Sequence, residues 1–454
     1  MREFIGRKNE LTRLESIWNR DGNRAVAVYG RRRIGKSELL RRFCSDKRSL
    51  YIECILGSLP DNIHSIHRAV SLLDGVDSEE PVYLKDTFDR ILDCCRKEKT
   101  AVVFDEIPYL LDSAEHVGSL LQHLTDSITR ETDSMIVICC SSMSVMKRET
   151  TEYDRPLYGR FSERMEIGAL SFGECRLFHP NMDSLDSLKL YLSVGGIPKF
   201  HLDRETRTYR EYIERHFLSP DSDMVDEGET LITAEFSPAG RYMAIVNAVS
   251  DGSTSLKTIS ERSGIQRNTC QRCIDDLMTA GILGIVKPMM NAPKRPVYMI
   301  CDPMIAFCQS VIRDSRAFLL RNSSEIYDSI SSKIDTFLGT RFEDFCSDYV
   351  MNRWSCMDLG KWWGPDEDGT IREIDIVATV KDGTSSYGLF GECKFGKRIM
   401  PASVYRELVD DVSLIRTDLN RRYVLFSVSG FSDELRDIAE SEDVLLIGPE
   451  QLLE

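Results

Sequence analysis

Residues 25–37 read AVAVYGRRRIGKS, and residues 38–44 read ELLRRFC. The run Ala25–Tyr29 is largely apolar on both faces, which predicts a strand buried in a parallel sheet. Residues 30–37 fit the pattern G-x-x-x-x-G-K-[ST], and Glu38–Cys44 predicts a helix. Such a loop lets backbone N–H groups close around a triphosphate, and the positive end of the helix dipole adds to the attraction. The stretch therefore predicts a nucleotide-binding α/β domain.

Each position of this loop has an expected role. Lys36 should reach the β- and γ-phosphates of ATP, and the Ser37 hydroxyl should bind Mg²⁺. The other expected nucleotide-binding positions are Gly30, Arg31, Arg32, Arg33, Ile34 and Gly35. The alternative is a chance glycine-rich turn, and the strand before it and the helix after it argue against that alternative.

A second apolar run, Ala101–Phe104, ends in two acids, Asp105 and Glu106. Asp105 would hold the Mg²⁺ shell, and Glu106 would orient and deprotonate the attacking water. A kinase would not need the glutamate, so the pair favours ATP hydrolysis. The alternative is an acidic pair that caps the following helix.

Two further residues follow the run Met135–Cys140. Ser141 would contact the γ-phosphate or the water, unless it is only a turn or cap serine. Arg160 would stabilise the charge of the transition state as an arginine finger, unless it is a solvated surface residue. The break Gly195–Pro198 would bring backbone, with Pro198, to the nucleotide base, or would be a plain turn between helices.

Composition limits the classes of protein that remain. The 454 residues predict about three domains at roughly 150 residues each. Hydrophobic residues make up 42% and charged residues 29%, which excludes a disordered or collagen-like chain. The apolar runs are too short for a membrane span, and the start of the chain is polar. Fourteen cysteines without a disulfide framework indicate reduced thiols, typical of a cytoplasmic protein.

The chain contains 58 basic and 73 acidic residues, for a net charge of −15. This balance argues against a protein that coats nucleic acid through bulk charge. Residues 253–300 differ, because they hold seven basic residues and three acidic ones. A local basic patch is therefore expected there.

Four segments are expected along the chain. A nucleotide-binding core with a parallel sheet takes residues 1–175, and a helical lid takes 176–235. A winged helix-turn-helix takes 236–315, and a second α/β domain takes 316–454.

The spacing of Leu256–Ser263 and Arg267–Ala280 around a short turn is that of a helix-turn-helix. Arg267 and Arg272 lie near the start of the second helix, where a recognition helix touches DNA. Residues 288–296, with Lys294 and Arg295, would form the wing between two strands. DNA is the expected partner of these four basic residues. The alternative is a winged helix used only for packing or for protein contacts.

Three charged residues are expected side by side in the last domain. Asp375 and Glu392 lie equally far from the centre of the turn at 381–386, so a regular hairpin makes them cross-strand neighbours. Lys394 shares their face. Two carboxylates and a lysine suit a Mg²⁺ site for phosphodiester cleavage, and Glu343, on a helix over 333–354, could complete the shell. The alternative is a salt-bridged sheet edge.

Together these motifs resemble a predominantly archaeal family of P-loop ATPases related to the AAA+ and STAND classes. The family begins with a Phe-x-Gly-Arg box, here Phe4-Ile5-Gly6-Arg7, and carries the loop at 30–37. It also has a Pro-Leu-Tyr-Gly-Arg box, here 156–160, and a Gly-Gly-x-Pro motif, here 195–198. The resemblance implies that Phe4, Ile5 and Pro198 contribute to nucleotide binding.

Many members of that family continue with a winged helix and a domain similar to the PD-(D/E)xK nucleases. Phe342-Glu343, Glu373–Val377 and Gly391–Lys394 match that domain. The resemblance implies an ATP-driven switch, with ATP and Mg²⁺ as cofactors, that controls a DNA nuclease of restriction-endonuclease-like fold. The competing interpretation is a signalling or scaffold ATPase whose C-terminal half only binds partners. A homo-oligomer is compatible with both.

Overall fold

The computed structural model describes residues 4–76, 81–220, 222, 224–290, 292, 297–319 and 322–453. The chain divides into two compact units. The first comprises residues 1–174 and 196–202, and the second comprises residues 175–195 and 203–454.

The first unit is built on a five-stranded sheet of order β2-β3-β4-β1-β5, and all of its strand pairs are parallel. Its strands are β1 (Ala25–Tyr29), β2 (Ser49–Glu53), β3 (Ala101–Asp105), β4 (Met135–Cys140) and β5 (Glu163–Glu166). Its helices are α1 (Lys8–Asn19), α2 (Lys36–Cys44), α3 (Leu59–Asp74), α4 (Leu84–Lys97), α5 (Ile107–Leu111), α6 (Val117–Glu131), α7 (Met143–Thr151) and the 3-10 turn η1 (Pro198–His201). Helix α8 (Phe172–Arg176) crosses into the second unit. The predicted parallel sheet of a P-loop protein is confirmed.

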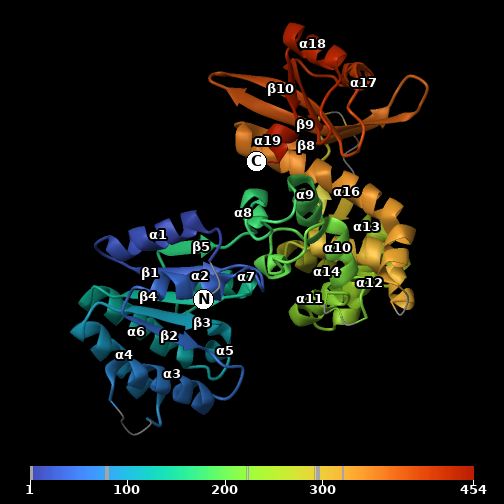
Figure 1. The fold of residues 1–454 in the computed structure, drawn as a ribbon. Coiled ribbons are helices and arrows are strands. Elements are labelled where there is room, and N and C mark those ends of the chain that lie inside the picture. The colour runs from blue at the N-terminus through green and yellow to red at the C-terminus, as the bar shows by residue number, and fades with distance from the viewer. Residues whose placement is uncertain are drawn as a thin grey trace. The chain divides into compact units, whose positions relative to one another are not determined.

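Helices cover both faces of this sheet (Figure 1). On one face Ala25, Ala27 and Tyr29 of β1 join a core with apolar residues of α3, α4 and α6. Successive strand residues point to opposite faces, so Val26 and Val28 face the side where α1 and α2 lie. Burial on both faces explains why the strands are nearly all apolar, and it leaves their ends as the place for polar chemistry.

The second unit begins with helices and one hairpin. They are α9 (Ser184–Val194), α10 (Tyr209–His216), α11 (Glu227–Glu235), α12 (Ala239–Ser250), α13 (Leu256–Ser263), α14 (Arg267–Thr279), β6 (Leu283–Val286), β7 (Val297–Ile300), α15 (Pro303–Phe307), the π-helix η2 (Cys308–Ile312), the 3-10 helix η3 (Arg313–Phe318) and α16 (Ser323–Arg353). The order of three helices and a two-stranded hairpin over 239–300 is the one expected.

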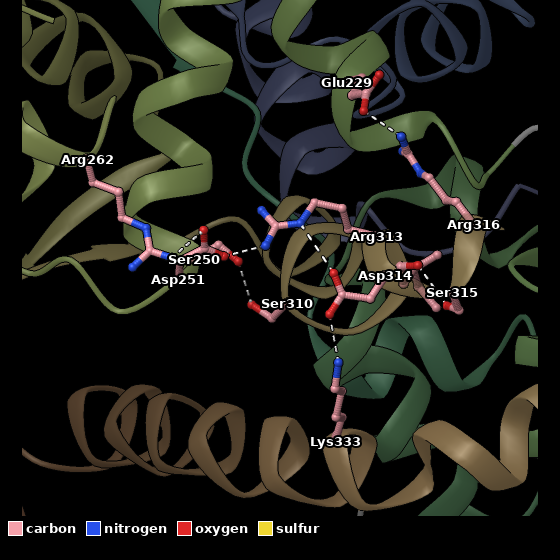
Figure 2. A network of polar contacts seen from close by, with 11 residues as sticks. Glu229, Ser250, Asp251, Arg262, Ser310, Arg313, Asp314, Ser315, Arg316 and Lys333 are labelled. Atoms are coloured by element: carbon pink, nitrogen blue, oxygen red, sulfur yellow. Dashed lines mark hydrogen bonds and ion pairs between the residues drawn. The ribbon is translucent and has the colours of Figure 1, made fainter. Parts of the chain in front are cut away.

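A polar network joins this helical segment to α16 (Figure 2). Asp251, which follows α12, pairs with Arg262 of α13 and with Arg313 of η3. The neighbouring Asp314 pairs with Lys333 of α16 at 2.8 Å. The helix-turn-helix segment is thereby tied to the long helix by charges as well as by packing.

The first half of the connection between β6 and β7 is partly buried, unlike an exposed wing. Met289 and Ala292 are buried in the core of the C-terminal sheet domain. Lys287 and Met289 exchange backbone hydrogen bonds with Lys361. Apolar side chains drive this burial, and the segment forms a single parallel β-bridge between Pro288 and Lys361 of the sheet instead of a free wing. Lys294 and Arg295 lie outside the described residues.

The chain ends in a mixed five-stranded sheet of order β12-β11-β10-β9-β8. Its elements are β8 (Cys356–Pro365), β9 (Ile371–Asp382), β10 (Ser385–Lys394), α17 (Ala402–Ser413), β11 (Asn420–Ser427), α18 (Asp433–Ser441), β12 (Val444–Ile447) and α19 (Pro449–Leu452). Strands β9 and β10 form the expected hairpin, with Asp382 opposite Ser385 and Ile376 opposite Gly391. The sequence does not predict strand β8, because its apolar residues alternate irregularly.

Two further observations concern the cysteines and the helices. All fourteen cysteines are free thiols, as expected. Within the described parts of the chain, every helix is too short or too polar to cross a membrane.

Candidate functional site

The phosphate loop joins the carboxyl end of β1 to the first turn of α2. Gly30, Arg33 and Gly35 have φ of 157°, 65° and 90°, so the loop turns sharply through left-handed backbone. A Cβ atom on Gly30 would lie 2.4 Å from the carbonyl oxygen of Ile167. Only glycine fits there, because the neighbouring backbone cannot move aside.

Lys36 points into the loop that it closes. Its Nζ donates to the carbonyl oxygens of Gly30 at 2.8 Å and Arg31 at 2.9 Å, and the residue is buried. A buried ammonium held by carbonyl oxygens is suited to an anion, because a phosphate offers it the opposite charge. The loop and the helix start therefore fit a nucleotide triphosphate.

The predicted N-terminal box packs against the loop. Arg7 is buried and donates to the carbonyl oxygen of Ile34 at 2.9 Å, while its backbone N–H donates to Glu174. Phe4 and Ile5 are half-buried at the same end of the chain. Arg7, to which the sequence motif alone gives no role, is the residue of the box that braces the loop.

The Gly-Gly-x-Pro motif also reaches the loop. Pro198 Cγ lies 3.6 Å from the place that a Cβ on Gly35 would occupy. A Cβ on Gly196 would lie 2.0 Å from the carbonyl oxygen of Leu170, so this position requires glycine. The motif is therefore more than a turn between helices, because it sets Pro198 beside the phosphate loop.

Each of the two acids at the end of β3 is held by a residue on or next to a neighbouring strand. Asp105 is buried, and its Oδ2 accepts a hydrogen bond from the Tyr51 hydroxyl of β2 at 2.6 Å. Glu106 Oε2 accepts from the Ser141 hydroxyl at 2.9 Å and from the Ser141 N–H at 3.2 Å. Tyr51 was missed because nothing in its local sequence marks it.

Glu106 has a strained backbone. Its φ of 52° and ψ of 51° lie in the left-handed region, which side chains other than glycine rarely adopt. Such strain persists where the surroundings hold a residue in a working orientation. Ser141 thus touches the proposed base, and its expected contact with phosphate or water stays a prediction.

Arg160 lies at the other end of the sheet. Its carbonyl oxygen accepts from the Asn23 side chain, and Asn23 precedes β1, whereas the phosphate loop follows it. Seven residues of extended chain separate these two places, about 20 Å at ~3.3 Å per residue. Its guanidinium is 3.6 Å from Asp126. A finger acting on the loop of the same chain is thus excluded by distance.

We predict that Arg160 acts in trans, on the nucleotide of a second copy. Arg160→Ala should lower kcat about 10–100-fold, the size of one charge-assisted hydrogen bond, with little change in ATP Kd. Arg130→Ala, beside the same surface hollow, is the matched control. Steady-state kinetics measure kcat, and sedimentation measures the oligomeric state. Full activity in a strict monomer would contradict the prediction.

In the C-terminal sheet three carboxylates lie together. The hairpin register continues to bring Asp375 level with Glu392, and Asp375 Oδ2 accepts from the N–H of Cys393 at 3.0 Å. Glu343 of α16 joins them. Burial, followed by the charge of Asp375, raises the pKa of Glu343 and of Glu392 to about 7 in each case. Burial also raises the pKa of Asp375.

Two lysines accompany the carboxylates. Lys394 Nζ lies 2.5 Å from Glu392 Oε1, as the shared face predicts. Lys361 of β8 pairs with Glu343 and lies 3.5 Å from Glu373. It stands where the register of β8 and β9 shifts, between Gly360 and Trp362. A bulge re-aims side chains, so Lys361 could not be foreseen from strand alternation.

The ammonium groups affect what the cluster can hold. Among the residues that the structure describes, no three His, Cys, Asp or Glu side chains are gathered closely enough to hold a metal ion. Glu343 is engaged by Lys361, so the expected third ligand is occupied by a cation of the protein. Glu392 is likewise paired with Lys394, so each glutamate of the cluster is engaged by a lysine, and a divalent ion between Asp375 and Glu392 stays a prediction.

The helix-turn-helix segment exposes part of the expected basic patch. Arg267 and Arg272 are exposed on α14, together with Gln266 and Asn268. Cys270 and Cys273 are buried on the opposite side of that helix. The exposed side chains at the start of α14 are those that a nucleic acid could contact.

Comparison with known proteins bears on the first unit most directly. Residues 4–200 match the model of a family described as an ATPase domain predominantly from Archaea. This match covers less than half of the chain, and it shows that residues 4–200 are similar to that family. Residues 307–404 match a second model, described as archaeal and bacterial proteins of unknown function. The ATPase part of the expected resemblance is thereby confirmed, and the winged-helix and nuclease parts stay predictions.

Individual proteins are also similar to this chain. An uncharacterized protein of Methanocaldococcus jannaschii is 24% identical over 431 residues, which is 92% of this chain and 94% of the relative. An ATP-binding protein of the same archaeon is 42% identical over 45 residues, 10% of this chain and 76% of the relative. A solved Walker-type ATPase of Pyrococcus abyssi is 18% identical, with a TM-score of 0.53 over 67% of this chain and 96% of its own. That structure shares the fold.

Proposed function

We propose that this protein binds and hydrolyses ATP. The observation that carries the proposal is the pair of acids at the end of β3, in a domain whose loop encloses the Lys36 ammonium. Tyr51 of β2 holds Asp105, and Ser141, which follows β4, holds Glu106. Lys36 and the loop backbone would hold the phosphates, and Ser37 and Asp105 would hold Mg²⁺. A bound Mg²⁺ would supply charge neutralisation at the phosphates. Glu106 would accept the proton of the attacking water.

Phosphate release by the purified full-length chain tests this proposal. Activity should require ATP and Mg²⁺ and should vanish with EDTA. A chain that binds no ATP by calorimetry would contradict it.

We further propose that the second unit binds DNA and cleaves it with a divalent metal ion. The supporting observation is the group of carboxylates formed by the buried Asp375 and the half-buried Glu343 and Glu392, and the pKa of each of the two glutamates is raised to about 7. Burying like charges is costly, and it is tolerated where a cation binds. Lys394 would hold a water or a phosphate oxygen. ATP hydrolysis would then switch this activity, whereas a scaffold role would leave the cluster as a salt-bridged sheet edge.

The DNA contacts are proposed at the start of α14. Reversing Arg267 and Arg272 to Glu should weaken DNA binding and reduce the slope of log K against log salt by ~0.9 for each phosphate that the protein no longer neutralises. Lys85→Glu, exposed on α4, is the control and should leave the slope unchanged. Fluorescence anisotropy with a random duplex at several salt concentrations measures it, and an equal slope in both variants would assign α14 to packing or protein contacts.

A further inference from the structure

Tyr51 touches the two residues that are expected to hold Mg²⁺. Its hydroxyl lies 2.6 Å from Oδ2 of Asp105 and 3.4 Å from the carbonyl oxygen of Ser37. Tyr51 belongs to β2, Asp105 ends β3, and Ser37 stands in the first turn of α2. One side chain therefore links the phosphate loop to the acidic end of β3.

The ring of Tyr51 is held in place on its strand. The guanidinium of Arg41 lies 5.1 Å from the ring centroid, and Arg41 also pairs with Glu53, two residues further along β2. In the sheet, Tyr51 is level with Val103 and Glu53 with Asp105. The ring of Tyr51 thus lies beside Arg41, and its hydroxyl lies next to Asp105 at the carboxyl end of the sheet.

The direction of the hydrogen bond is fixed by chemistry. A carboxylate has no proton to donate, whereas the tyrosine hydroxyl carries one, so the Tyr51 hydroxyl donates and Asp105 Oδ2 accepts. Asp105 accepts this bond on Oδ2 and a second from the N–H of Glu106 on Oδ1 at 3.1 Å. A carboxylate oxygen has more than one acceptor site, so both oxygens keep capacity for the water shell of a metal.

We propose that Tyr51 is a positioning residue for the Mg²⁺ of the nucleotide: it holds the Asp105 carboxylate in the orientation that the metal requires and keeps it in register with Ser37. The inference rests on the proposed ATP hydrolysis. It assigns a role to a residue of β2, outside both sequence motifs. Loss of the hydroxyl leaves Asp105 free to rotate about its side-chain bonds, and the entropy of fixing it again opposes metal binding.

The test compares full-length wild type with Tyr51→Phe, which removes only the hydroxyl. Tyr83→Phe, an exposed tyrosine of the same domain, is the matched control. Three quantities are measured: the Mg²⁺ concentration for half-maximal hydrolysis, the affinity for Mn²⁺ in the presence of ADP by calorimetry, and the affinity for ATP with EDTA. Melting temperature is recorded for each variant.

In Tyr51→Phe the Mg²⁺ concentration for half-maximal hydrolysis should rise about tenfold, and the Mn²⁺ affinity should fall by a similar factor. This is the size of the effect expected from losing one hydrogen bond to a charged group. ATP affinity with EDTA should stay within twofold. Unchanged Mg²⁺ and Mn²⁺ values, or a lower melting temperature without a metal effect, would overturn the inference.

A double-mutant cycle gives a second measurement that does not depend on hydrolysis. If Tyr51 acts through Asp105, Tyr51→Phe should not reduce Mn²⁺ affinity further in an Asp105→Asn background. Additive losses would overturn the inference. If wild type hydrolyses no ATP, the proposed function fails, whereas the calorimetric cycle still decides whether Tyr51 positions Asp105.

Discussion

Lys36→Ala should abolish ATP binding, whereas Glu106→Gln should keep it and lose turnover. Lys36 supplies the positive charge inside the phosphate loop, where its Nζ now rests on two carbonyl oxygens. Without it the phosphate charge is uncompensated. Glu106→Gln keeps the shape of the side chain and removes the base, so kcat should fall ~10²–10⁴-fold. Calorimetry with ATP and phosphate-release kinetics measure the two effects separately.

A matched control for the charge change is Lys97→Ala, because Lys97 is exposed at the end of α4. It should behave as wild type in both measurements. Equal loss of ATP affinity in Lys36→Ala and Glu106→Gln would contradict the division of roles between binding and hydrolysis.

Asp375→Asn should abolish Mg²⁺- or Mn²⁺-dependent cleavage of plasmid DNA, and Lys394→Ala should do the same, while ATP hydrolysis continues. Asp375 is the carboxylate whose charge acts on both Glu343 and Glu392, so the substitution would remove a proposed metal ligand from the centre of the cluster. Lys394 is the cation nearest Glu392. Agarose gels of nicked and linear product, with EDTA as a blank, measure cleavage.

The competing interpretation, a salt-bridged sheet edge, gives the opposite pattern. Wild type would show no cleavage, and the two changes would lower the melting temperature of the domain. Asp358→Asn serves as the control, because Asp358 lies on β8 and pairs only with Lys287 among the ion pairs of the described residues. It should alter neither cleavage nor melting.

Much of the first unit was accessible from the sequence. Strands such as Ala25–Tyr29 and Met135–Cys140 were predicted with their observed bounds, because residues buried on both faces of a sheet must be apolar. The phosphate loop was also predicted from the sequence, since the residues of its motif are consecutive. The hairpin of β9 and β10 followed from symmetry about its turn.

Other features needed the fold. Residues 288–296 were expected to form the wing, yet Met289 and Ala292 within them are buried in the core of the C-terminal sheet domain. The sequence of a loop does not show which other segment will cover it. Arg160 was predicted to be an arginine finger that acts in trans, and only the sheet shows that it lies at the end of β1 opposite the phosphate loop of its own chain. Its action on a second copy stays a prediction. Lys361 lies in the carboxylate cluster because the strand register shifts between Gly360 and Trp362, and the alternation of residues along a strand does not predict such a shift.

The sequence by itself determined which chemistry the ATPase domain carries. The residues of the phosphate loop follow one another in the sequence, and so do the two acids at the end of β3, so each group is placed in space by local backbone structure alone. The tertiary structure alone decided what holds those groups. Tyr51 meets Asp105 and Ser141 meets Glu106 across separations of 54 and 35 residues. Contacts at such range arise from the order of strands in the sheet, which local composition does not encode.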